Sequence, residues 1–389
     1  MKPETIVKST LDAWAEEARV PAGLADRALR GRTRRRSFKI ALVGGTSALL
    51  AGATAVVLVS AGGPVRPSQQ VAFEPVSLSA DTSLRTDLGS GFPSRLVAAG
   101  HTAVAAYYTG NTAMGAERGT VRRTWHLYNP STGAYGKTDW AYLDVAPGMQ
   151  RAAVLRGPLP ASKVGVLDMK TQKVTRWIEV DHPVGGLAWS PDGRRLLLTS
   201  YSSNPDVIGG VPGASPRTGY YVVDSAAEPG AFHTLPGLPG NPNHRQDLGW
   251  SRDGKLIWAP TATEPTKVFY DQDGRKRPAP AHEAEDQQEA GLSPNGALRA
   301  RFGPAPGPAV TITDVKSDRK VAVLPIQQAL AWADDGKLFA MGCDVKKCEG
   351  KGEFRNRLLL VTLKGKITPL TGYQRSDRAG SWTPLFTHR

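Results

Sequence analysis

Cysteine is scarce in this chain, and the linear motifs that mark common catalytic centres are missing. Only two of the 389 residues are cysteine, so a small fold held together by a disulfide framework is excluded. No Gly-x-Ser-x-Gly sequence occurs, and a nucleophile elbow is therefore not indicated. His282 and Glu283 begin the sequence HEAED, but Asp286 stands where a zinc-protease helix needs its second histidine. We predict no catalytic residue, no metal site and no cofactor.

The chain instead repeats two short patterns. An apolar strand that ends in Asp, Asn or Thr before a polar turn occurs six times. The six copies are Thr124–Asn129, Lys163–Asp168, Gly219–Asp224, Thr266–Asp271, Ala309–Asp314 and Arg357–Thr362. Between them runs a second pattern, clearest as LAWSPDGRRLLL at Leu187–Leu198, with variants at 248–258, 290–300 and 330–340. A strand-only period of roughly 40 to 50 residues is typical of propeller blades.

The second pattern predicts a β-hairpin. In the tetrad S-P-D-G at 190–193, proline presets φ for a type I turn and glycine adopts the left-handed conformation. We expect Asp192, Asp253 and Asp335 to be turn residues that hydrogen-bond to their own backbone.

This hairpin, followed by an apolar strand ending in Asp, resembles the repeats of TolB-like and WD40-like β-propellers over about residues 92–389. The resemblance implies an all-β fold, and six outer strands predict a six-bladed β-propeller. The inner strand has seven candidates, so the first and last are expected to share one closing blade. In that blade Gly380–Pro384 would lie beside Leu96–Tyr107. Propellers host many functions, so the resemblance alone does not identify one.

A run of 20 uncharged residues, Ile40–Val59, precedes the repeats. As a helix it would extend about 30 Å, the thickness of the hydrocarbon core of a bilayer. Six basic residues precede the run closely, whereas the next one after it is Arg66. The positive-inside rule then predicts a cytoplasmic N-terminus. The alternative, a signal peptide cleaved near Val59–Ala61, is disfavoured because nearly 40 residues precede the apolar run, more than a whole signal of about 15–30 residues contains.

Four regions follow from this interpretation. Residues 1–37 form a partly helical cytoplasmic segment, 38–60 a transmembrane helix, 61–91 a linker and 92–389 an extracytoplasmic propeller. The chain would be a single-pass protein of a bacterial cell membrane. Apolar residues of Pro3–Arg19 fall near one helical face. This layout resembles that of membrane-bound anti-sigma factors, although the zinc-binding His/Cys motif is missing.

The net charge of +14 divides between the two sides of the predicted membrane. Residues 1–39 contain 10 basic and 5 acidic side chains, a net charge of +5, which leaves +9 for the rest of the chain. Such a charge often indicates nucleic-acid binding, but an extracytoplasmic domain faces anionic lipid and wall polymer instead. We therefore expect no nucleic-acid partner.

The two cysteines, Cys343 and Cys348, lie in one insertion, CDVKKCEGKGE. Outside the membrane the environment permits oxidation, so a local disulfide between them is favoured. A metal pair is the alternative, but no histidine or second cysteine pair supplies the other ligands that zinc normally requires.

Tryptophan is the remaining residue type with functional potential. Trp189, Trp250, Trp332 and Trp382 occupy repeat positions and are expected to pack between blades. Three others are less constrained by the repeat and could contact a ligand: Trp140, Trp177 and Trp258.

Together these features favour a non-catalytic binding or scaffold module for a protein or cell-envelope partner, acting as a monomer. One alternative is a hydrolase or lyase whose residues converge from several blades and leave no linear motif. Another is a sensor coupled through residues 1–37 to a cytoplasmic regulator.

The predicted topology can be tested with reporter fusions. A reporter that is active only outside the membrane should be active after Arg389 and inactive before Met1. Substitution of Arg34, Arg35, Arg36 and Lys39 by neutral residues should weaken this orientation, because it removes positive charge that keeps the N-terminus in the cytoplasm. Recovery of soluble protein that begins at Ala61 or beyond would contradict the retained helix.

Overall fold

The computed structural model is an all-β chain. It describes residues 73, 77–114, 119–208, 215–224, 229–238, 245–261, 265–284, 289–303, 309–342, 357–373 and 382–389. The predicted cytoplasmic segment, the predicted transmembrane helix and the pair Cys343 and Cys348 lie outside these residues. None of the described residues belongs to a helix with the length and hydrophobicity that a membrane crossing requires. Their one helical element is a short 3₁₀ turn, η2 (Pro147–Met149).

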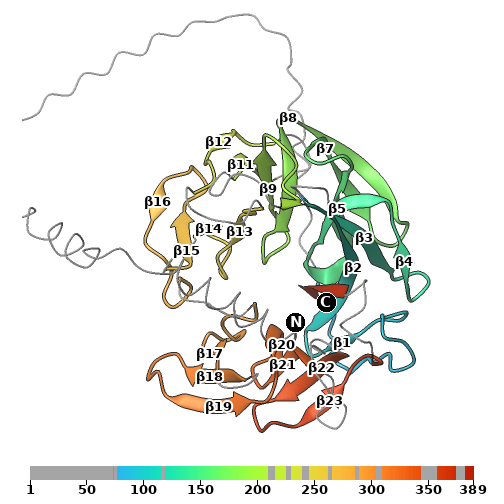
Figure 1. Cartoon of the computed structure of the whole chain (residues 1–389), viewed down its shortest axis with the longest axis vertical. Helices are drawn as coiled ribbons and strands as arrows, with labels where there is room; N and C mark the ends of the chain where they lie inside the picture. Colours follow the sequence, from blue (N-terminus) through green and yellow to red (C-terminus); the bar gives the residue numbers. More distant parts are fainter. Residues whose placement is uncertain are drawn as a thin grey trace, which may run out of the picture. The chain divides into compact units, whose positions relative to one another are not determined.

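The described strands form five antiparallel sheets that follow one another in chain order, except that two later strands return to the first sheet (Figure 1). The first sheet contains β1 (Ala98–Ala99), β2 (Thr102–Met114), β3 (Gly119–Asn129), β4 (Ala134–Lys137), β10 (Val207–Ile208) and β24 (Trp382–His388). The second contains β5 (Trp140–Val145), β6 (Arg151–Arg156), β7 (Ala161–Asp168), β8 (Lys173–Trp189), β9 (Leu196–Tyr201), β11 (Arg217–Val223) and β12 (His233–Thr234).

Three smaller sheets complete the described fold. The third contains β13 (Gly249–Trp250), β14 (Ile257–Pro260), β15 (Lys267–Tyr270) and β16 (Lys276–Arg277). The fourth contains β17 (Leu298–Phe302), β18 (Val310–Asp314) and β19 (Lys320–Leu324). The fifth contains β20 (Gln328–Asp334), β21 (Lys337–Gly342), β22 (Arg357–Thr362) and β23 (Ile367–Pro369). Each of the six predicted apolar strands coincides with a strand: β3, β7, β11, β15, β18 and β22.

The two ends of the domain meet in one sheet. Strand β24 pairs with β2 in a register that runs from Thr102 opposite His388 to Thr109 opposite Trp382. The red β24 lies beside the cyan β2 in Figure 1. This pairing confirms the prediction that the last inner-strand copy shares a sheet with residues near Leu96–Tyr107, and the fold is a β-propeller.

The S-P-D-G turns are held by a repeated hydrogen-bond network. Ser190 Oγ donates to Asp192 Oδ1 (2.5 Å), and the same carboxylate oxygen accepts from Arg194 N (3.1 Å). Arg195 N donates back to Ser190 Oγ (2.9 Å), and Gly193 has a φ of 66°. Equivalent networks form at 251–256 and 293–298. The turn chemistry read from the sequence is thus confirmed at Asp192 and at Asp253.

The fourth turn differs from the prediction. Asp334 Oδ1, not Asp335, accepts from the backbone two residues on, at Gly336 N (2.9 Å). Asp335 Oδ1 instead accepts from Asn295 N of the preceding repeat (2.9 Å). The turn here is one residue tighter than S-P-D-G, so its second aspartate is free to link two neighbouring turns.

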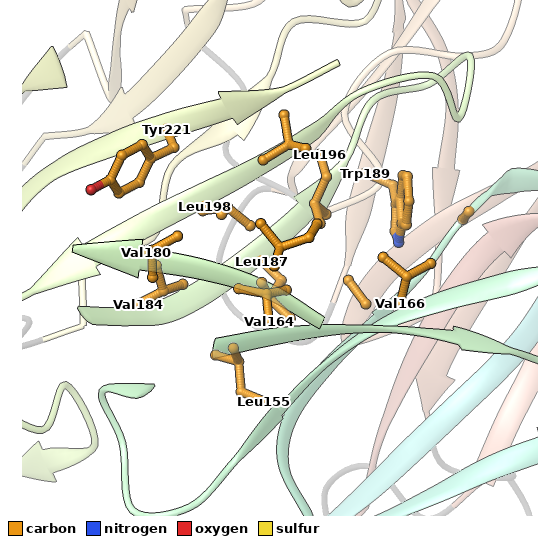
Figure 2. Close-up of a cluster of buried hydrophobic side chains, with 14 of the residues drawn as sticks. Leu155, Val164, Val166, Val180, Val184, Leu187, Trp189, Leu196, Leu198 and Tyr221 are labelled. Carbon is orange, nitrogen blue, oxygen red and sulfur yellow. The ribbon is translucent and has the colours of Figure 1, made fainter. Parts of the chain in front are cut away.

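The middle strands are buried on both faces. In β6, Ala153 and Leu155 belong to one apolar cluster, whereas Ala152 and Val154 belong to another. Because successive side chains in a strand point to opposite faces, such a strand reads as a continuous apolar run. Figure 2 shows the first cluster, in which Leu155 and Val164 face Leu187 and Leu198. Burial of this kind contributes roughly 25 cal/mol per Å² of apolar surface.

Consecutive sheets are joined around the whole propeller. Apolar clusters join the first sheet to the second, the second to the third, the fourth to the fifth, and the fifth to the first. Between the third and fourth sheets, Arg252 Nη1 donates to Ser293 O (3.3 Å). The repeat tryptophans are buried at these contacts, as predicted. Trp250 Nε1 donates to Ala188 O (3.0 Å) and Trp332 Nε1 to Gly291 O (3.3 Å).

The C-terminal residue ties the closing strand to the chain that leads into the domain. Arg389 Nη2 donates to Ser83 O (2.5 Å) and Nε to Gly100 O (3.1 Å). Further back, Phe73 packs edge-on against Trp189, with ring centroids 5.2 Å apart. The described part of the expected linker 61–91 therefore packs against the propeller.

Closure can be tested by removing its last strand. Trp382→Ala should lower the free energy of unfolding by about 3 kcal/mol or more, since the side chain is 3% exposed between sheets. Deletion of residues 378–389 should cost more, because it also leaves β2 as an unpaired edge. Trp177→Ala, which removes a partly exposed indole, is the matched control. A truncated domain that stays monomeric and melts near the intact one would contradict closure by β24.

Candidate functional site

The inner strands line an open cavity of about 690 Å³. It lies at their carboxyl ends, and its wall includes residues from the ends of β5, β8, β13, β20 and β24. The turn residues Pro191, Arg252 and Pro294 also lie in its wall. A concave site lined by apolar side chains with a few convergent polar groups is the usual place for ligand binding, so this cavity is the first candidate.

Asp144 is the most perturbed acid in the cavity wall. Its Oδ2 accepts a hydrogen bond from Trp189 N (2.7 Å), which joins β5 to β8. Burial raises the pKa of Asp144 to about 7, against the opposing effect of hydrogen bonds from Trp189 N and Val145 N. The carboxyl group is therefore partly protonated near neutral pH.

Glu289 is the second acid in this wall. Its Oε1 accepts a hydrogen bond from Gln328 Nε2 (2.7 Å). Two carboxyl groups in one cavity, one of them with a raised pKa, are a common arrangement for acid–base chemistry.

The serine hydroxyls in the cavity wall are engaged in the turns. Ser190 and Ser251 each donate to the aspartate of their own turn, at 2.5 Å and 2.7 Å. Both are fully buried. A nucleophilic serine needs an adjacent base that takes its proton, and these two hydroxyls donate to structural carboxylates instead.

A network of charges lies toward the opposite ends of the strands. Arg245 Nε donates to Asp206 Oδ1 (2.8 Å), and Arg245 Nη1 donates to Asp247 Oδ2 (2.7 Å). Arg123 of β3 forms an ion pair with Asp206 (2.5 Å). Tyr201 OH donates to Asp247 Oδ1 (2.6 Å), and burial together with this carboxylate raises the pKa of Tyr201 well above 10. The network links the first, second and third sheets.

The segment that follows β9 joins this network through Asp206 and crosses to the first sheet. Its strand β10 pairs with β3 of that sheet. Gly185 and Gly186 make room for it: a Cβ at Gly185 would lie 2.8 Å from Pro205 Cγ, and one at Gly186 would clash with Asp247. The adjacent glycines in VGGLAW were a local signal for this close packing that the sequence analysis missed.

The three less constrained tryptophans have different surroundings. Trp258 lines the central cavity, and Lys267 Nζ lies 5.0 Å from the centroid of its ring. Trp140 and Trp177 lie together on the second sheet, with ring centroids 6.2 Å apart. The sequence singled out all three, but their spacing gave no indication that two of them form a pair.

The described residues contain no cluster of three or more His, Cys, Asp or Glu side chains that could hold a metal ion. The predicted disulfide between Cys343 and Cys348 lies outside the described part of the chain.

The fold has distant counterparts among solved structures. No protein-family model and no curated protein matches the chain. Kuenenia stuttgartiensis hydrazine synthase is 15% identical over 60% of this chain and 68% of its own, with a TM-score of 0.34. A mitotic checkpoint complex structure is 15% identical over 82% and 87% of the two chains, with a TM-score of 0.36. TolB from Acinetobacter baumannii is 14% identical over 68% and 69%, with a TM-score of 0.35. At these identities the likeness concerns the β-propeller fold alone.

The raised pKa of Asp144 makes stability depend on pH. The folded-state pKa of about 7 lies above the value of 3.8 expected for an unfolded chain, so the contribution of Asp144 to stability is fully present below pH 3.8 and is lost as the pH rises toward 7. Since one pKa unit corresponds to about 1.4 kcal/mol, the loss is on the order of 4 kcal/mol. Asp144→Asn keeps an oxygen acceptor for Trp189 N and should remove this loss. We expect its thermal denaturation midpoint to exceed the wild-type value at pH 8 but not at pH 4.

Asp253→Asn is the control for this measurement. Although burial opposes it, hydrogen bonds from Lys255 N and Ser251 Oγ hold the pKa of Asp253 below its usual value. Its substitution should therefore give no gain at high pH. Identical pH profiles for the wild type and Asp144→Asn would contradict the assignment.

Proposed function

We propose that the chain is a non-catalytic binding module for a protein or cell-envelope partner. In this proposal the β-propeller has six blades, is extracytoplasmic and is anchored by one membrane-spanning helix over residues 38–60. The observation that carries the proposal is the central cavity. The hydroxyls of Ser190 and Ser251 in its wall donate hydrogen bonds to the aspartates of their own turns instead of to a catalytic base.

Six blades are supported by how the strands group. The seven-stranded sheet divides naturally within β8, a strand of 17 residues. The first half of β8 pairs with β7, and the second half pairs with β9. Dividing the second sheet there gives two blades, and the other four sheets each supply one. The isolated bridge between Leu292 and Arg299 supplies the inner strand position of the fourth sheet.

Binding at the cavity can be tested by site-specific photo-crosslinking in cells that make the protein. A photoreactive residue in place of Pro294, in the cavity wall, should give a discrete crosslinked product. The same residue in place of Lys316, an exposed position after β18, is the matched control and should not. Equal labelling at the two positions would count against the cavity as the binding site.

The enzyme alternative is favoured by one specific observation, the pair Asp144 and Glu289 in the same cavity wall. Glycoside hydrolysis uses such a pair, one as acid and the other as base or nucleophile. Purified full-length protein should show no turnover of glycan or peptide substrates. Turnover that Asp144→Asn and Glu289→Gln both abolish would overturn the non-catalytic proposal.

A further inference from the structure

A second candidate binding site lies on the surface of the second sheet, away from the central cavity. Trp140 of β5, Arg156 of β6 and Trp177 of β8 come together there, and we call these three residues the Trp–Arg–Trp clamp. The Arg156 guanidinium carbon lies 5.5 Å from the ring centroid of Trp140 and 5.4 Å from that of Trp177. The two indole planes meet at 58°, so the guanidinium sits in the angle between them.

The backbone of the sheet positions this clamp. Gly165 lies opposite Trp177 in the strand register, and a Cβ at Gly165 would come within 3.1 Å of the Trp177 ring. Glycine at this position therefore lets the indole lie close over the sheet. Trp177 is nevertheless 38% exposed, and it is the only aromatic residue apart from Phe302 among the exposed large hydrophobic side chains of the described residues.

Among the described residues, the guanidinium in the clamp has no partner besides the two rings. Within the part of the chain that the structure describes, Arg156 makes its two ring contacts but no hydrogen bond and no ion pair, and it is exposed. The neighbouring cation Lys163 differs, because its Nζ pairs with Glu179 Oε1 (2.5 Å). The clamp thus holds one uncompensated, planar cation whose N–H donors are available to a ligand.

We propose that the Trp–Arg–Trp clamp binds an acidic sugar unit of an anionic cell-envelope polysaccharide. A guanidinium can donate two parallel hydrogen bonds to one carboxylate. Because the Arg156 guanidinium already stacks on two indoles, the side chain loses less conformational entropy when it binds a ligand. The exposed part of Trp177 offers a flat apolar surface for the C–H face of a pyranose ring. The net charge of +9 outside residues 1–39 also favours an anionic polymer.

This inference rests on the proposed binding function and names its ligand class, but it uses residues outside the central cavity. The test is isothermal titration calorimetry on the full-length protein in detergent. The probes are a hexamer of galacturonic acid, a neutral hexamer of glucose, a hexaglutamate peptide and inorganic phosphate. We expect the acidic hexasaccharide to bind most tightly and its affinity to fall with added salt.

Three variants locate the site. Arg156→Gln should weaken binding of the acidic hexasaccharide about tenfold or more, because it removes a charge-assisted contact. Arg156→Lys keeps the charge without the planar fork and should recover only part of the affinity. Lys163→Gln is the matched control, and since its charge is already paired we expect less than about a twofold change. Unchanged thermal denaturation midpoints would show that each variant is folded.

The possible results separate the two proposals. No binding of the acidic hexasaccharide, equal binding by the Arg156→Gln variant, or tighter binding of the neutral sugar would each overturn the clamp. If hexaglutamate bound more tightly than the acidic hexasaccharide, the ligand of the clamp would be an acidic peptide and not a sugar. If inorganic phosphate bound more tightly, the ligand would be a phosphate group. None of these outcomes affects crosslinking at Pro294, which tests the central cavity.

Discussion

The pairing of β24 with β2 is the contact on which the rest of the structure depends. A blade buries both faces only if it has a neighbour on each side, and the first and last blades become neighbours only when the chain ends meet. Trp382 begins the closing strand and packs with Tyr107 and Phe339 in the cluster that joins the first and fifth sheets. The guanidinium of Arg389 then secures the strand to Ser83 and Gly100. Without this pairing, the cluster would be exposed to solvent and the central cavity would lose the part of its wall that β24 supplies.

The repeated parts of this fold were predictable because their causes are local. A proline, an aspartate and a glycine within four residues specify a turn, and the turn fixes where the next strand begins. The six apolar strands were therefore found at their predicted positions. Asp335 was misassigned because a shorter turn moved the backbone hydrogen bond to Asp334, while Asp335 reached the neighbouring repeat. Such differences depend on packing between repeats, which a single repeat does not encode.

The candidate sites were less predictable because they are made by residues far apart in the chain. Asp144 and Trp189 are separated by 45 residues, and Asp206 and Arg245 by 39. The pKa of Asp144 depends on its burial between strands, and no feature of the sequence near Asp144 reports that burial. The tryptophans were a partial exception: Trp140 and Trp177 stood out because they did not fit the repeat. Their contact with Arg156 depends on strand register and on Gly165, which only the assembled sheet reveals.

The two candidate sites differ in the balance of their charges. The wall of the central cavity contains the acids Asp144 and Glu289 together with the base Arg252, whereas the Trp–Arg–Trp clamp presents an unpaired guanidinium on a surface that is basic overall. A polyanion is attracted by the charge of the clamp. In the cavity the two acids oppose the attraction of Arg252, and their opposition weakens as Asp144 becomes protonated. One propeller can therefore hold an anionic polymer at its side and a different partner at its centre, because the clamp presents a cation alone and the cavity presents charges of both signs.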